Sequence, residues 1–256
     1  MPSGGGGGPE TGGFLLLVAH GSRDPRHART VRALTRRIRS TRPGLPVGTA
    51  FLDFDPPSVP GALERLARHG ARRVVVQPLL LTHAFHAAVD LPGLLRQAPP
   101  SLAVRQAPVL GPDPLLTAAL ERRLYEAGVG PGARAATAVV LAAAGTTDPE
   151  AAAAFAGAAR RWQRTGWRAV RPASASGGAF PRTGDAVRAL RAEGARRIAV
   201  APYVLAPGRL PDRIAAGAAE AGADHLGAVL GAAPELARLV LLRYDAARAR
   251  ALAPAG

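Results

Sequence analysis

Three histidines stand directly after apolar runs in the first half of this 256-residue chain. His20 follows the run Phe14–Val18, and His83 and His86 follow the longer run Val74–Leu81. Imidazole binds borderline divalent metals and also accepts protons near neutral pH. Because the chain contains no cysteine, a transition-metal site here must use nitrogen and oxygen ligands. The histidines therefore predict a site that holds a divalent metal, moves protons, or does both.

The two histidines of the second segment have further partners in sequence. Asp90 lies four residues after His86, where it can orient the imidazole through a hydrogen bond or cap a helix that begins at Leu91. His83 is either a third metal ligand or a residue that lines the cleft. Two other histidines, His27 and His69, are expected on solvated helix surfaces.

The histidines need a scaffold that brings two distant segments together. Apolar runs predict buried strands, and the runs are Phe14–Val18, Val47–Phe51, Val74–Leu81, which is interrupted at Gln77-Pro78, and Leu102–Val109. Helices are predicted to begin at Asp24-Pro25, Ser58 and Asp113-Pro114, because an oxygen-bearing cap precedes each amphipathic stretch. Such an alternation predicts a parallel sheet covered by helices on both faces. The loops after its first and third strands would then meet at the carboxyl edge, where ligands bind.

The same pattern recurs in the second half of the chain. At an offset of 124 the matched pairs are Asp24/Asp148, Pro57/Pro181, Leu66/Leu190, Gly70/Gly194 and Pro78/Pro202. Further on the offset falls to 120, where Val109–Gly111 matches Val229–Gly231. The chain is therefore predicted to be two copies of one α/β unit. We place the units at residues 14–128 and 137–250, with a linker at 129–136, a flexible Gly-rich tail at 1–13 and a second tail at 251–256.

The two copies differ at the histidines. His20 aligns with Ala144, His83 with Pro207 and His86 with Leu210. The first unit is therefore predicted to carry the site, while the second is a degenerate copy.

Two motifs around these histidines resemble a known family. Val18–Pro25 (VAHGSRDP) resembles the opening motif of the CbiX/SirB sirohydrochlorin chelatases, and Leu81–Pro92 (LTHAFHAAVDLP) resembles their second motif. The resemblance implies two chelatase-like, flavodoxin-like units with an active-site cleft between them. It also implies that His20 and His86 are the pair that binds metal and accepts protons. Many members carry glycine in the segment Leu81–Ala84, which leaves the role of His83 open.

The family resemblance also implies a reaction and its reactants. Fe2+ or Co2+, with Ni2+ as a further choice, would be inserted into sirohydrochlorin, an octacarboxylate tetrapyrrole, without ATP. The product would serve sirohaem or cobalamin biosynthesis, and no cofactor is expected beyond the divalent metal substrate. The alternative is a non-catalytic protein of the same fold that binds or delivers a tetrapyrrole or a metal.

The positive charge of the arginines suits them to bind the carboxylates of this substrate. The chain carries 33 basic residues, all of them arginine, against 18 acids, for a net charge of +15. Eight substrate carboxylates require donors that remain charged, which favours arginine. The residues expected to contact the macrocycle are Arg23, Ser22 and Arg26 beside His20, Asp90, and Arg209 and Arg213 in the equivalent loop of the second unit.

Other functions fit the sequence less well. The arginines are spread over both units, and Trp, Tyr and Phe number only 2, 3 and 6, which disfavours nucleic-acid binding. A histidine phosphatase would need an arginine where Ala19 stands. The apolar run Phe14–Ala19 is too short to span a membrane. We therefore expect a cytoplasmic monomer.

Overall fold

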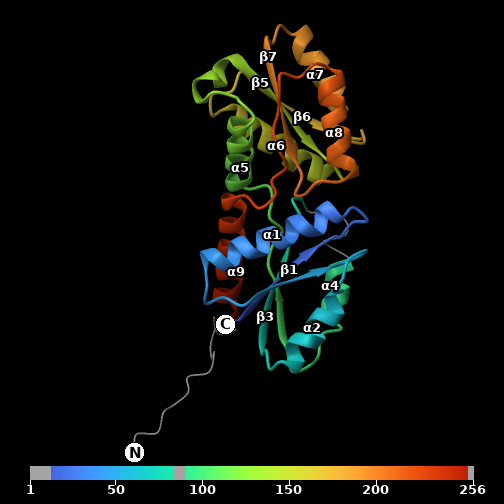
Figure 1. Ribbon diagram of the computed structural model, residues 1–256, viewed down its shortest axis with the longest axis vertical. Helices are drawn as coiled ribbons and strands as arrows, with labels where there is room; N and C mark the ends of the chain where they lie inside the picture. The colour runs from blue at the N-terminus through green and yellow to red at the C-terminus, as the bar shows by residue number, and fades with distance from the viewer. Residues whose placement is uncertain (1–12, 83–89, 253–256) are drawn as a thin grey trace, which may run out of the picture.

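The computed structural model describes residues 13–82 and 90–252, which form two α/β units (Figure 1). Each unit is built on a parallel four-stranded sheet, with the strand orders β2-β1-β3-β4 and β6-β5-β7-β8. The strands of the first sheet are β1 (Phe14–Ala19), β2 (Val47–Phe51), β3 (Arg73–Pro78) and β4 (Ala103–Gln106). Those of the second are β5 (Thr137–Ala143), β6 (Ala169–Ser174), β7 (Arg197–Tyr203) and β8 (His225–Leu226). The predicted duplicated α/β fold is confirmed.

Helices alternate with these strands along the chain. They are α1 (Pro25–Thr41), α2 (Val59–Arg68), α4 (Asp90–Leu95), α5 (Pro114–Glu126), α6 (Pro149–Gln163), α7 (Thr183–Ala192), α8 (Arg209–Glu220) and α9 (Pro234–Leu252). The predicted starts are confirmed at Asp24, Ser58 and Asp113, which are the N-caps of α1, α2 and α5. The carboxylates of Asp24, Asp113 and Asp148 each accept a 2.9 Å hydrogen bond from the backbone N–H two residues on. The segment predicted as a linker contains a short 3-10 helix, Pro131–Ala136.

The duplication extends to small details of the backbone. The hydroxyls of Ser22 and Thr146 each accept a 3.1 Å hydrogen bond from the backbone N–H two residues on. The offset of 124 is not uniform, however. Ala19 pairs with Phe51 in the first sheet, whereas Ala143 pairs with Ser174 in the second, which is an offset of 123 at β2 and β6. One residue is therefore lost before β6 and regained in the loop that follows it.

The last helix of each unit packs against the sheet of the other unit. Helix α5 contacts β7, and α9 contacts α1, β3 and β4. Figure 1 shows α5 beside the second sheet and α9, in red, beside the first. One buried cluster accordingly contains Val75 of β3 with Val240 of α9, and Ala199 of β7 with Leu120 of α5. The boundaries 14–128 and 137–250 describe the repeat in the sequence. In the structure, the buried core of each unit includes a helix from the other unit.

The two exchanged helices also contact each other. The guanidinium of Arg122 on α5 donates a 3.0 Å hydrogen bond to Glu235 at the start of α9, and Arg243 on α9 donates one of 3.0 Å to Asp113. None of the helices within residues 13–82 and 90–252 is long and apolar enough to cross a membrane.

Helix α9 offers a matched pair of leucines to test the exchange. Leu236 is 0% exposed and Leu242 is 50% exposed. We expect Leu236→Ala to lower the free energy of unfolding by about 2–5 kcal/mol, because it leaves a cavity in the shared core. Leu242→Ala should change the free energy of unfolding by less than about 0.5 kcal/mol, as surface substitutions do. Urea unfolding of both variants measures this, and equal losses would contradict the packing of α9.

Candidate functional site

His20 lies at the carboxyl end of β1, with its side chain exposed. Strand β1 is flanked by β2 and β3, so its end stands in the middle of the sheet edge. The imidazole meets the ring of Phe54 edge-to-face, with 6.2 Å between ring centroids. His20 is therefore presented at the edge where parallel sheets bind ligands, as predicted.

The loop after β2 is held tightly against the loop after β1. The backbone N–H of Asp53 donates a 2.9 Å hydrogen bond to the carbonyl of His20. Gly21 has a φ of 96°, and a Cβ at this position would overlap the carbonyl oxygen of Asp53. The backbone N–H of Ser22 donates a 3.1 Å hydrogen bond to the Asp55 carboxylate. Glycine is required at position 21 both by conformation and by this close approach.

Acidic and aromatic side chains in the β2 loop join the site. Phe54 has a φ of 63°, an uncommon conformation for a large side chain, and its ring is 51% exposed. The guanidinium carbon of Arg23 lies 5.6 Å from the centre of the Phe54 ring. Asp53, Phe54 and Asp55 are not among the site residues predicted from the sequence. The available signal was their position directly after the second predicted strand, at the same carboxyl edge.

The loop after β3 emerges beside His20. The backbone N–H of Leu79 donates a 2.7 Å hydrogen bond to the carbonyl of Val18, immediately before the histidine loop. The predicted meeting of the two loops is therefore confirmed. His83 and His86 lie outside the described residues, and Asp90 is described only as the first residue of α4.

The predicted metal ligands are His20, His83 and His86. Within residues 13–82 and 90–252, no three His, Asp or Glu side chains gather closely enough to hold a metal ion. The set of His20, His83 and His86 stays a prediction, because two of its members are not described.

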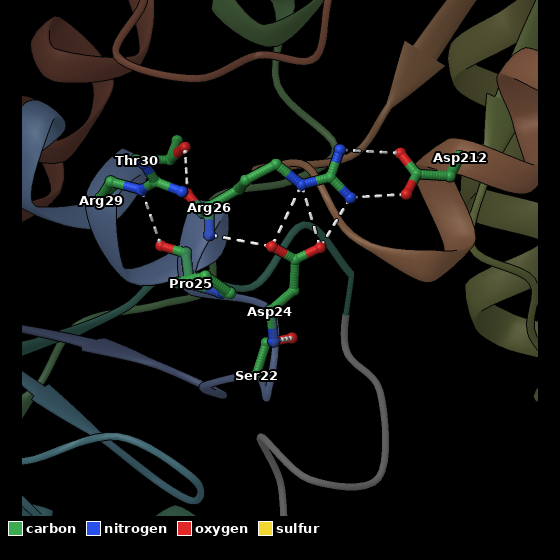
Figure 2. A network of polar contacts seen from close by, with 7 residues as sticks. All are labelled: Ser22, Asp24, Pro25, Arg26, Arg29, Thr30 and Asp212. Atoms are coloured by element: carbon green, nitrogen blue, oxygen red, sulfur yellow. Dashed lines mark hydrogen bonds and ion pairs between the residues drawn. The ribbon is translucent and has the colours of Figure 1, made fainter.

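Arg26 links the two units next to the histidine loop (Figure 2). Its guanidinium donates to both carboxylate oxygens of Asp24 and, at 2.5 and 3.2 Å, to those of Asp212 on α8. Hydrogen bonds from Arg26 lower the pKa of Asp24 to about 2, and those to Asp24 and Asp212 raise the pKa of Arg26. The stabilising contribution of the ionised Asp24 is therefore present above its ordinary pKa of 3.8 and is lost progressively as the pH falls through about 2.

Comparison with known proteins shows the family to which the chain belongs. The CbiX family model matches residues 14–127 and 138–247, which are both units. The chain belongs to the CbiX family. A curated relative from Priestia megaterium, named sirohydrochlorin cobaltochelatase, is 28% identical over 205 residues, covering 78% of this chain and 66% of that protein. The sirohydrochlorin ferrochelatase of Bacillus subtilis is 31% identical over 140 residues, covering 53% of this chain and 52% of the relative.

Solved structures agree on the fold. SirB from Bacillus subtilis with Fe3+ superposes with a TM-score of 0.81 at 24% identity, covering 94% of this chain and 97% of that one. A structure described as CbiX, the terminal enzyme for biosynthesis of sirohaem in denitrifying bacteria, gives a TM-score of 0.65 at 26% identity, covering 91% and 99%. The matched part of the chain covers less than two thirds of the length of the first curated relatives. It spans 66% of the Priestia megaterium protein and 57% of a sirohydrochlorin cobaltochelatase from Methanocaldococcus jannaschii.

The arginines and Ser22 of this CbiX-family chain have varied surroundings. The side chain of Ser22 accepts a hydrogen bond that shapes the loop, and Arg26 is engaged by Asp24 and Asp212. Arg209 and Arg213 were expected in a loop, which is wrong: both are exposed in the first two turns of α8. Helix α8 begins at Arg209, with Gly208 as its N-cap. Substrate contact by these residues stays a prediction.

His27 is not a solvated surface residue, so that expectation is wrong. It is half-buried, its ring lies 6.4 Å from that of Phe51, and its Nδ1 is buried without a hydrogen-bond partner. Burial lowers the pKa of His27 and so favours the neutral imidazole. His69 is exposed, as expected, and its Nδ1 lies 2.7 Å from the carbonyl of Arg65.

Gly21→Ala tests the close approach of the two loops. We expect it to lower the free energy of unfolding by the strain of a positive φ, roughly 1–2 kcal/mol, plus the overlap with Asp53. Gly70→Ala is the matched control, because Gly70 has a φ of 81° but open space around its Cβ position. Chemical denaturation should show a clearly larger loss for Gly21→Ala. Equal losses would mean that the loops are not in close contact.

Proposed function

We propose that this protein inserts Fe2+ or Co2+ into sirohydrochlorin without ATP, with Ni2+ as a further metal. The observation that carries the proposal is the match of both units to the CbiX family, with His20 at the carboxyl edge of β1. The names of the curated relatives, cobaltochelatase and ferrochelatase, support the same reaction and leave iron and cobalt as the two metals to compare. We further propose that the protein works as a cytoplasmic monomer without an additional cofactor.

The reaction sets clear requirements for the site. The macrocycle gives up two pyrrole N–H protons, and the divalent metal takes their place after losing bound water. The charge balances, because two protons leave for each dication that enters. A site for this exchange needs ligands that hold the metal weakly enough to release it, together with nearby proton acceptors.

The residues at the sheet edge meet these requirements in our proposal. The exposed imidazole of His20 holds the metal with His86, and one of the two accepts a pyrrole proton. His83 is a further ligand in the same loop. The exposed Asp53, whose backbone N–H bonds to the His20 carbonyl, supplies a carboxylate that accepts the second proton or binds the metal.

The substrate carboxylates require cations around this edge. Arg23 is the first choice, because its exposed guanidinium lies over the Phe54 ring beside His20. Arg209 and Arg213 reach toward the substrate from α8, the helix that Arg26 bridges to α1 through Asp212. Asp90 orients His86, and Ser22 shapes the histidine loop.

The histidine assignment is tested by metal insertion in vitro. Sirohydrochlorin is incubated anaerobically with Fe2+ or Co2+ and the protein, and the absorbance of the free macrocycle is followed. We expect His20→Ala and His86→Ala to reduce the rate close to the protein-free rate, because both metal holding and proton transfer are lost. His69→Ala is the control and should retain full activity, because His69 is exposed and bonded to its own helix.

The outcomes of this assay separate the alternatives. Rates unchanged in both histidine variants would show that the site is wrongly assigned. A wild-type protein that binds metal or macrocycle but does not speed insertion would instead be a delivery protein. The ratio of the Fe2+ and Co2+ rates decides between service to sirohaem and to cobalamin biosynthesis.

Arg23→Gln tests the carboxylate contact separately. Removing one charged donor should raise KM for sirohydrochlorin about tenfold and leave kcat nearly unchanged, as expected for a contact made equally in ground and transition states. Arg29→Gln is the matched control. Like Arg23, Arg29 is exposed, but it lies on α1 and its side chain donates to the carbonyl of Pro25. A fall in kcat with unchanged KM would contradict this role for Arg23.

A further inference from the structure

A tyrosine of the second unit reaches the histidine-bearing loop of the first. Tyr203 is the last residue of β7 and is 4% exposed. Its hydroxyl donates a 3.2 Å hydrogen bond to the carbonyl of Leu81, in the loop after β3. Leu81 precedes His83 by two residues and His86 by five. The contact therefore joins the degenerate unit to the loop that leads into the second motif.

Three consecutive residues of this loop form hydrogen bonds with three different segments of the chain. The Leu79 N–H donates to Val18 at the end of β1, at 2.7 Å. The Leu80 carbonyl accepts a 2.9 Å hydrogen bond from the N–H of Leu110, which follows β4. The Leu81 carbonyl accepts from Tyr203. The first two anchors belong to the same unit as the loop, whereas the third comes from the other unit and is the nearest of the three in sequence to His83 and His86.

The tyrosine itself has little freedom to move. A Cβ on Gly111 would overlap both the hydroxyl of Tyr203 and the carbonyl of Leu81, so the three groups are in close contact. On its own side, the Tyr203 ring lies 5.3 Å from that of Phe155, which lies 5.5 Å from that of Phe180. Burial raises the pKa of Tyr203, so the phenol keeps the proton that it donates.

The first unit has a different residue at the position that corresponds to Tyr203. At the offset of 124, Tyr203 aligns with Leu79, next to the matched prolines Pro78 and Pro202. One copy thus has histidines in its loop and a leucine at this position, whereas the other has no histidines there and a tyrosine.

We infer that Tyr203 is a positioning residue, whose hydroxyl fixes Leu81 in the loop after β3, the segment that leads in sequence into the second histidine motif of the proposed site. This inference rests on the proposed function. The unit that lacks the histidines thereby contributes to the site through the placement of the other unit's loop. A displacement of about 1 Å in a reacting group can cost about a hundredfold in rate. We therefore expect the loss of this anchor to lower kcat by roughly ten- to a hundredfold.

The test replaces one hydroxyl and leaves the ring. Tyr203→Phe removes the donor to Leu81. Tyr244→Phe is the matched control, because Tyr244 is 1% exposed and its hydroxyl donates 2.6 Å to the backbone carbonyl of Gly13. That bond also joins α9 to the first unit, but Gly13 precedes β1 and so lies at the opposite edge of the sheet. Both variants lose a buried bond of the same type.

Two measurements are made on each full-length variant. Hydrogen exchange, followed by mass spectrometry, reports the protection of the peptide that contains residues 79–82. The insertion assay gives kcat and KM for sirohydrochlorin. We expect Tyr203→Phe to speed exchange in this peptide and to lower kcat with little change in KM. Tyr244→Phe should leave both unchanged, although the two melting temperatures should fall by similar amounts.

Each other outcome is decisive. Unchanged exchange in Tyr203→Phe overturns the anchor, whatever the rates show. Faster exchange with unchanged kcat overturns the positioning role. An equal loss of kcat in Tyr244→Phe would show a general effect of stability. If the wild type does not insert metal, the proposed function fails, and with it the role in that reaction, whereas the exchange measurement still decides the anchor.

Discussion

Each sheet of this protein is covered in part by a helix from the other half of the chain. Helix α9 packs on β3 and β4, and α5 packs on β7. Burial of apolar surface is the dominant favourable term in folding, so a sheet whose face is completed by the other unit depends on that unit for stability. The duplicated units are therefore not independent domains, and their relative placement is set by the same packing that forms their cores.

This exchange explains how a site can use both units. Two contacts from the second unit reach the carboxyl edge of the first sheet, one from Tyr203 of β7 and one from Asp212 of α8. The Arg26 pair with Asp212 is exposed, and exposed ion pairs contribute little to stability. The buried bond from Tyr203 is the firmer of the two links. The ion pair keeps the Arg26 guanidinium and the Asp212 carboxylate together near the edge where a polycarboxylate substrate is proposed to bind.

The two copies have diverged in side chains while keeping the same backbone turn. The first keeps an exposed histidine after β1, whereas the second has Ala144 there, yet both retain the turn with a positive-φ glycine, Gly21 or Gly145. A backbone conformation that needs glycine survives because the fold depends on it. The side chain next to it can change without disturbing that conformation. Asp53, Phe54 and Asp55 complete the first unit's edge from the loop after β2.

Local sequence determined much of this structure. The strands, the Asp-Pro helix starts at Asp24 and Asp113 and the place of His20 follow from patterns within a few residues, because caps and apolar periodicity act locally. The duplication follows from the repeat of that pattern at an offset of 124 residues. The tertiary structure alone decided the exchange of α5 and α9, the burial of His27, and the partners of Arg26 and Tyr203. These contacts join residues more than a hundred positions apart or depend on which face a neighbour covers. A periodic pattern shows that a helix has an apolar face, but only the packed chain shows which sheet buries it.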